Sequence, residues 1–187
     1  MIQKRTAILP TVKTVHLADE KRIFDLRAEY ALTAVKLGLI AERYDRILAL
    51  SIDPVLPRYF VGNPRPLRKI FTRLVETALL AVNVDIVTVR IENVGLEDQE
   101  TNKVKLSVTA NGPGLSPATL HILQQPALFS PHYTTDENSS TLFTINEQIR
   151  RLGGRLHVES LHGWGTRYVI DFQLTKFAAH QIYANAS

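Results

Sequence analysis

The sequence of 187 residues contains no cysteine, which excludes disulfide bonds, thiolate catalysis and cysteine-ligated zinc. No run approaches the ~20 apolar residues of a membrane-spanning helix, and the amino terminus MIQKRTAILPTV lacks the apolar core and cleavage site of a signal peptide. We therefore expect a soluble, cytoplasmic chain, either complete or as the cytoplasmic portion of a larger membrane protein.

Excess charge of one sign is also scarce. Lys and Arg together number 22 against 18 for Asp and Glu, a net charge of +4, and the basic residues are scattered along the chain. Nucleic-acid binding is left open by this charge but is not indicated. Hydrophobic residues make up 45% of the sequence, which predicts one globular domain over residues 1–187 with a substantial core.

The longest well-capped amphipathic pattern is NPRPLRKIFTRLVETALLAV at residues 63–82, which predicts a helix. Asn63 is the expected N-cap, and Pro64 and Pro66 fall in the first turn, where a missing N–H costs nothing. Spacings of three and four place one apolar stripe toward the core: Leu67, Ile70, Phe71, Leu74, Ala78 and Val82. A second row beside this stripe consists of Arg73, Thr77 and Leu80.

Before this helix, the sequence TVKTVHL at residues 11–17 alternates like a short edge strand. A further amphipathic helix is expected to begin at Phe24 with Asp25 as its cap. Its apolar face consists of Leu26, Tyr30, Ala34, Leu37 and Ala41. Residues 46–53 predict a strand, and the prolines of residues 53–60 predict a loop.

After the helix, the alternating runs 86–94 and 103–110 predict two strands joined by a polar hairpin connection. Ser116 is the expected cap of a short helix, and residues 142–154 predict another helix that ends at Gly153 or Gly154. The remaining segment predicts a hairpin with a turn at Gly163, Gly165 and Thr166 and with inward-facing Tyr168, Ile170, Phe172 and Leu174.

The pattern at residues 62–82 resembles the first helix of the ATP-binding domain of sensor histidine kinases, in the GHKL ATPase family. That family reads roughly G-D-P-x-x-L-x-x-I-L-x-N-L-x-x-N-A-x-K, and the matching residues are Gly62, Asn63, Pro64, Leu67, Ile70 and Phe71. The two family asparagines fall on Arg73 and Thr77, and the family lysine falls on Leu80. The resemblance implies that Thr77 replaces the asparagine that ligates the magnesium of Mg-ATP, and that Arg73 puts a cation beside that position.

A second block, Ala110-Asn111-Gly112-Pro113-Gly114-Leu115, resembles the family's D-x-G-x-G-[IL] box. Gly112, Gly114 and Leu115 match, but Ala110 stands at the aspartate that accepts a hydrogen bond from adenine. A methyl group cannot accept that bond, and its loss removes on the order of 1 to 3 kcal/mol. Alternatively, the two glycines serve only a turn that needs positive φ.

Two further blocks complete the resemblance. Phe129, Pro131 and His132 echo the family's F-x-P-F box. The glycines of its phosphate-covering lid fall on Glu137, Ser139 and Thr141, while Asp136 and Glu137 add negative charge. A cradle of backbone N–H groups needs conformations that glycine reaches most cheaply, so phosphate binding here is not expected.

The resemblance covers residues 22–175 and implies a two-layer α/β sandwich, in which three helices cover a mixed, mostly antiparallel sheet. The degenerate kinase-like domain of Rcs-type phosphotransfer proteins combines a kept frame and lost motifs in a similar way. The resemblance therefore implies a pseudo-ATPase with no catalytic residue, metal or cofactor. Its implied partners are a response regulator, a histidine phosphotransfer domain or a kinase domain, or a second copy in a homodimer.

Two alternatives stay open. One is a nucleotide or small-ligand sensor that binds through altered contacts in the same pocket, and the other is a histidine phosphotransferase, whose helical hairpin this chain lacks. His16 is not expected to accept a phosphoryl group, because VHLADEKRI lacks the proline of the kinase motif. His157 and His162 lack a third neighbouring metal ligand, so we interpret them as solvated hairpin residues.

Overall fold

The computed structural model describes residues 21–96, 100–124 and 137–177. Within these ranges, seven strands and four helices follow one another: β1 (Arg22–Asp25), α1 (Leu26–Arg43), β2 (Ile47–Ile52), β3 (Tyr59–Gly62), α2 (Pro64–Leu79), β4 (Ile86–Leu96), β5 (Thr101–Ala110), α3 (Pro117–Gln124), α4 (Glu137–Arg151), β6 (Arg155–Leu161) and β7 (Gly165–Lys176). The predicted edge strand at 11–17 and the segment from Phe129 to His132 lie outside the described residues.

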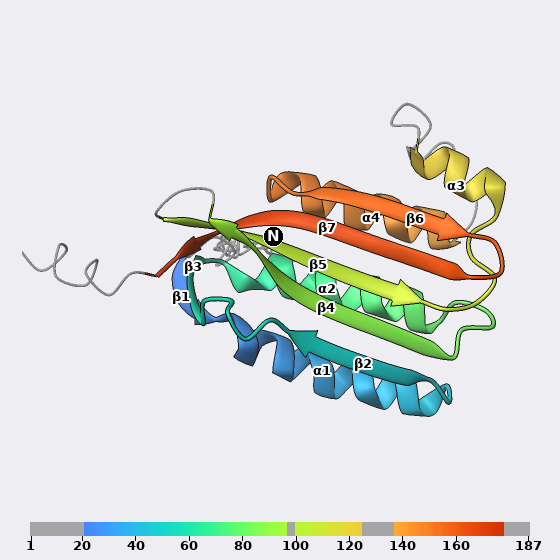
Figure 1. Ribbon diagram of the computed structural model, residues 1–187, viewed down its shortest axis with the longest axis horizontal. Coiled ribbons are helices and arrows are strands. Elements are labelled where there is room, and N and C mark those ends of the chain that lie inside the picture. The colour runs from blue at the N-terminus through green and yellow to red at the C-terminus, as the bar shows by residue number, and fades with distance from the viewer. Residues whose placement is uncertain (1–20, 97–99, 125–136, 178–187) are drawn as a thin grey trace, which may run out of the picture.

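The strands form one sheet in the order β1-β3-β7-β5-β4-β2, and β6 pairs with β7. Only β2 and β4 run parallel to each other among these pairs. Helices α1, α2 and α4 lie side by side against one face of the sheet, while α3 lies near the end of β6 (Figure 1). The predicted α/β sandwich with a mixed, mostly antiparallel sheet under three helices is confirmed.

Helix α2 is the central helix of this layer. Asn63 is its N-cap as predicted and accepts a hydrogen bond from the Arg65 N–H at 3.0 Å. The predicted core stripe is buried from Ile70 to Ala78, and Leu67 is partly buried. The prediction for Val82 is wrong: this side chain is 74% exposed, because the helix ends at Leu79 and Asn83 turns the chain with φ of 54°.

Helix α1 packs beside α2. Its predicted cap is confirmed, since Asp25 accepts hydrogen bonds from the N–H groups of Arg27 and Ala28 at 2.9 and 3.2 Å. The helix begins at Leu26 rather than at Phe24, which belongs to β1. Tyr30 meets the ring of Phe71 edge-to-face at 4.4 Å between centroids, which joins the two helices in the core.

The predicted loop over residues 53–60 contains the start of a strand that the sequence did not reveal. β3 has only four residues and pairs with β1 and β7. The preceding turn is held by the Arg27 guanidinium, which donates to the carbonyls of Asp53, Pro54 and Leu56 at 2.9 to 3.1 Å. So short a strand depends on neighbours distant in sequence, which local patterns do not report.

The final hairpin and helix α4 agree with the prediction except at their ends. Helix α4 begins at Glu137, five residues before the predicted start at 142. Gly165 and Thr166 begin strand β7 instead of lying in the turn, and they pair with the end of β6. The predicted inward face of the hairpin is buried, as expected for Tyr168, Ile170, Phe172 and Leu174.

Candidate functional site

A cavity of about 380 Å³ lies beside the last turn of α2. Its walls are that turn, the end of β5, the loop at 111–116, the start of α3 and the start of β7. Among the predicted pocket positions, the structure brings Thr77, Ala110 and Gly114 to this cavity. We treat it as the candidate site because these residues come from separate elements and face one hollow.

Ala110 is the last residue of β5 and is 4% exposed. Its neighbours in the sheet are Val87 on β4 and Thr166 on β7. Its methyl group therefore occupies a buried place on the cavity wall, at the position to which the resemblance assigns the family's aspartate. A methyl group offers no hydrogen-bond acceptor to a ligand.

The two glycines of the loop are required by close packing. Gly112 has φ of +121°, and a Cβ there would lie 2.6 Å from the carbonyl oxygen of Asn83. Gly114 has φ of +78°, and its Cβ would lie 2.8 Å from the carbonyl oxygen of Leu161. A side chain at either position would collide with backbone, so the packing of the loop accounts for both glycines without a ligand.

Hydrogen bonds from two residues that the sequence analysis did not single out hold the cavity wall. The Ser160 hydroxyl donates to the Gly165 carbonyl at 3.1 Å, accepts from the Leu115 N–H at 2.8 Å and lies 3.0 Å from the Thr166 hydroxyl. Asn111 Oδ1 accepts from the N–H groups of Asp85 and Ile86 at 2.8 and 2.9 Å. One sequence signal could have pointed to Asn111: it directly follows a predicted strand, and asparagine side chains often hydrogen-bond backbone groups in turns.

The described lining of the cavity carries no charged side chain. The Thr77 hydroxyl donates to the carbonyl of Arg73 at 2.8 Å, so its proton is used within the helix. Burial raises the pKa of Tyr168 to about 12, further above physiological pH than the ordinary phenol value, so this side chain is neutral. Within the described residues, the Tyr168 hydroxyl has no hydrogen-bond partner. The cavity thus offers neutral hydrogen-bonding groups and apolar surface.

Arg73 and Leu80 do not lie where the sequence analysis expected them. Arg73 lines a separate groove between α1 and α2, and it is not among the residues that line the cavity. The cavity begins only at the last turn of α2, whereas Arg73 lies one turn earlier and alongside α1. Leu80 is the C-cap residue, is 53% exposed and lies outside the cavity lining as well.

The expected lid positions Glu137, Ser139 and Thr141 lie in the first turns of α4. Their backbone is therefore helical, while Asp136 falls outside the described residues. Of these three side chains only that of Thr141 is described, and it is partly buried. The expectation that this segment does not bind phosphate stays a prediction, since a helical backbone alone does not test it.

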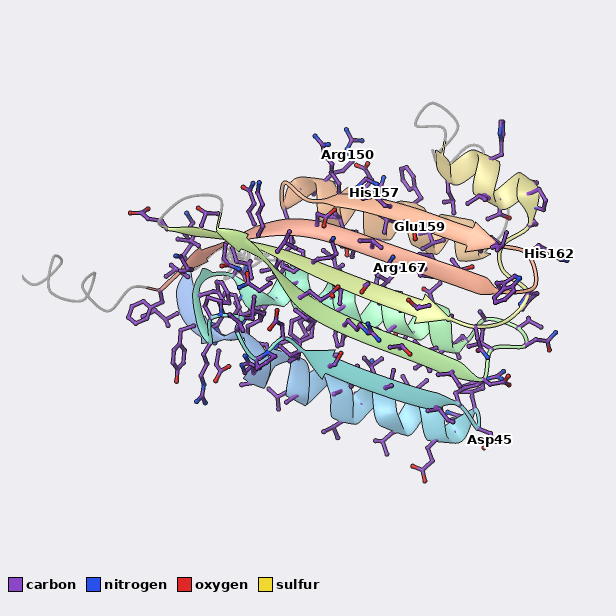
Figure 2. All side chains as sticks on the ribbon, in the orientation of Figure 1. Asp45, Arg150, His157, Glu159, His162 and Arg167 are labelled. Carbon is purple, nitrogen blue, oxygen red and sulfur yellow. The ribbon has the colours of Figure 1, made fainter. Side chains whose placement is uncertain are left out.

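The histidines lie apart from the cavity lining. His157 Nε2 is 3.7 Å from Asp171 Oδ2, and Figure 2 places His157 on β6 and His162 at the turn that follows this strand. The described part of the chain contains no group of three His, Asp or Glu side chains that would hold a metal ion. His16 lies outside the described residues.

Comparison with solved structures identifies the fold. Full-length ShkA in complex with AMPPNP matches with a TM-score of 0.65 and 19% identity over 88% of this chain, which spans 33% of ShkA. The catalytic domain of histidine kinase ThkA matches with a TM-score of 0.60 and 18% identity over 84% of this chain and 99% of that domain. Histidine kinase AdeS of Acinetobacter baumannii matches with a TM-score of 0.57 and 14% identity, over 82% of this chain and 66% of AdeS.

A sequence comparison with curated proteins finds no match. Within the described residues, no helix has the length and apolar character needed to span a membrane.

The family model described as histidine kinase-, DNA gyrase B- and HSP90-like ATPase matches residues 62–176, which include α2, the cavity loop and the final hairpin. Because this match covers more than half of the sequence, the chain belongs to the histidine kinase-, DNA gyrase B- and HSP90-like ATPase family.

Proposed function

We propose that this chain is a catalytically inactive member of its family, a pseudo-ATPase that serves as a protein-interaction or scaffolding module in a two-component His–Asp phosphorelay. The observation that carries the proposal is the buried Ala110 in a cavity whose described lining has no charge. Adenine would find no carboxylate at this wall, and a magnesium ion would find no charged ligand among the described lining residues.

The expected loss of affinity follows from summed magnitudes. An unmade hydrogen bond in a buried site costs on the order of 1 to 3 kcal/mol, and both Ala110 and Thr77 remove one family contact. Each 1.4 kcal/mol is about tenfold in affinity, so two such losses move a micromolar site to roughly millimolar. We therefore propose that the chain does not bind Mg-ATP at cellular concentrations.

The proposed partners are a response regulator, a histidine phosphotransfer domain or a kinase domain. The support for this class is that the solved structures with the same fold include the histidine kinases ShkA, AdeS and ThkA. We further propose that residues 1–187 form one cytoplasmic domain, comparable to the degenerate kinase-like domain of Rcs-type phosphotransfer proteins. Its function would then lie on its surfaces and not in turnover.

Titration calorimetry with ATP and magnesium tests the proposal. The wild-type chain is expected to give a dissociation constant of about millimolar or weaker, whereas the double variant Ala110→Asp, Thr77→Asn should bind at least tenfold more tightly. Arg73→Ala is the matched control, since Arg73 lies in another groove and its removal should leave ATP binding unchanged. A micromolar constant for the wild-type chain would contradict the proposal, most directly if Arg73→Ala abolished the binding.

A sensor of an uncharged ligand is the second candidate. The observation in its favour is the open cavity with neutral polar groups, including the Tyr168 hydroxyl that lacks a partner within the described residues. Thermal unfolding with adenosine, and with ATP for comparison, separates the two candidates. A rise in Tm with adenosine that Tyr168→Phe reduces would favour the sensor, whereas an unchanged Tm with both compounds agrees with the pseudo-ATPase.

A further inference from the structure

Helix α1 is apolar on two opposite sides. One side packs in the core through residues such as Tyr30 and Leu37. The other side exposes Leu32, Val35 and Leu39, which are 69%, 70% and 64% exposed. These three residues have the spacing i, i+3, i+7, so they lie on one face, which we name the outer α1 stripe. Figure 1 shows α1 at the edge of the helical layer, and α2 is the one helix beside it in the described part of the chain.

A groove of about 650 Å³ runs beside this stripe, between α1 and α2. Its lining shares Leu32 with the stripe and adds five cations and one carboxylate: Lys36, Arg65, Arg68, Lys69, Arg73 and Glu76. Glu76 pairs with Lys36 at 2.9 Å, and Arg68 pairs with Glu29 at 2.8 Å. Lys69 and Arg73 have no acidic partner within the described residues. We name this surface the basic groove.

The face of the sheet that the helices do not cover gives a reference for how charges are arranged on a solvated surface of this molecule. One row across four neighbouring strands reads Glu92, Lys105, Asp171 and Arg155, so its charges alternate in sign. The charges of this row are thus compensated within the chain. Lys69 and Arg73 lack this compensation, and the groove that they line borders exposed aliphatic side chains. This is the composition of a binding surface for an acidic, apolar partner.

We infer that the outer α1 stripe and the basic groove together form a docking surface for an acidic amphipathic helix of a partner protein. Its apolar residues would pack on Leu32, Val35 and Leu39, and its carboxylates would pair with Lys69 and Arg73. The inference rests on the proposed interaction role of the chain. It does not depend on whether the cavity at the last turn of α2 binds a nucleotide.

Other occupants fit this surface less well. A second copy that packed α1 against α1 across a two-fold axis would bring the two basic grooves together, and like charges would oppose that contact. Residues 1–20 of this chain carry Lys4, Arg5 and Lys13 against Asp19 and Glu20, so their net charge is positive and does not complement the groove. A membrane surface is a poorer match because the cations line a concave groove and the stripe has no aromatic anchor.

The test uses a synthetic, fluorescein-labelled helical peptide with leucines at spacings of three and four and glutamates on both flanks. Fluorescence anisotropy with the full chain is expected to show binding that weakens at high salt. Controls are the same peptide with lysine in place of glutamate and a scrambled acidic peptide. Equal binding of the acidic, lysine and scrambled peptides, or no binding of the acidic peptide, would overturn the inference.

Substitutions in the outer α1 stripe and the basic groove test whether the acidic peptide binds at this surface. Leu39→Ser and the double variant Lys69→Glu, Arg73→Glu should each weaken binding of the acidic peptide by about tenfold or more, equivalent to the loss of one good contact. Val94→Ser and Arg155→Glu are the matched controls, because they change an exposed aliphatic and an exposed cation on the sheet. Unchanged binding in the α1 and α2 variants, with circular dichroism confirming their fold, would refute the assignment.

Two further measurements decide between occupants. Light scattering after size exclusion would show a dimer, and cosedimentation with phosphatidylserine vesicles would show membrane binding. A dimer or a vesicle interaction that Leu39→Ser abolishes would overturn the inference in favour of that occupant. The ATP titration measures ligand binding in the cavity alone, and the peptide test measures binding at the docking surface. A result that contradicts the pseudo-ATPase proposal is therefore distinguishable from one that contradicts the docking surface.

Discussion

The core-facing side of α2 and the cavity at the end of the same helix are built in different ways. Ile70, Phe71, Leu74 and Val75 are between 0% and 4% exposed and pack among aliphatic and aromatic neighbours. The loop at 111–116 that walls the cavity is held by backbone, through the conformations of its glycines and the hydrogen bond that the Leu115 N–H donates to Ser160 Oγ. The comparison shows that side-chain packing holds the helix, whereas close backbone contacts hold the loop that walls the cavity.

The physical reason is that aliphatic packing needs volume and apolar surface, which many sequences supply. Ligand recognition needs a particular acceptor or cation at one place, and a single substitution such as alanine for aspartate removes it. The fold is therefore retained at 14% to 19% identity to known kinases, while Ala110 and Thr77 depart from the family pattern.

The largest expected effect tests the frame. Leu74 is fully buried, so Leu74→Ala should lower the free energy of unfolding by roughly 2 to 5 kcal/mol through the cavity that it leaves. Val82→Ala is the matched control, because Val82 is 74% exposed and its truncation should change stability by less than about 0.5 kcal/mol. Urea unfolding measures both, and equal effects would mean that the core side of α2 is wrongly assigned.

The next effect tests whether backbone packing holds the cavity loop. Gly112→Ala should destabilise the chain by about 1 to 3 kcal/mol, because positive φ and the Asn83 carbonyl both oppose a Cβ. Gly153→Ala provides the comparison, since Gly153 also has positive φ but no atom within 4 Å of its Cβ position. A cost for Gly112→Ala no greater than that for Gly153→Ala would show that packing against Asn83 contributes nothing.

The smallest effect concerns the cap of α1, far from the cavity. Burial alone would raise the pKa of Asp25, but hydrogen bonds from Arg58 and from the N–H of Ala28, together with the charge of Arg58, lower it overall below 3.8. The stabilising contribution is therefore present above about pH 4 and is lost as the pH falls through the folded-state pKa. Asp25→Ala should cost about 0.5 to 2 kcal/mol at pH 7 and less near pH 3.

Asp25→Asn is the control for this effect, because an asparagine keeps the N-cap hydrogen bonds and removes the charge paired with Arg58 at 2.7 Å. Its stability relative to wild type should fall less than that of Asp25→Ala at neutral pH. Unfolding midpoints measured between pH 3 and 7 decide the matter. A destabilisation by Asp25→Ala that stays constant over this range would contradict the assigned role of the carboxylate.

The sequence revealed those features whose cause is local. Asn63, Asp25 and Ser116 were predicted as helix caps, and each accepts a hydrogen bond from a backbone N–H of its own helix. The hairpin strands and the buried stripe of α2 were also predictable, because periods of 2 and 3.6 residues report which side chains face a core. Short strands such as β3 were missed because their pairing partners are remote in sequence.

The sequence by itself determined the fold class and predicted the candidate pocket residues, since both follow from residue types at fixed spacings. Only the tertiary structure decided which of these residues share a site. Arg73 and Thr77 are four positions apart on one helix, yet Arg73 lines the basic groove beside α1 whereas Thr77 lines the cavity, because the loop at 111–116 and the start of β7 wall the cavity only at the last turn of α2. Ser160 contacts Leu115 across 45 positions, and no local pattern encodes such a contact.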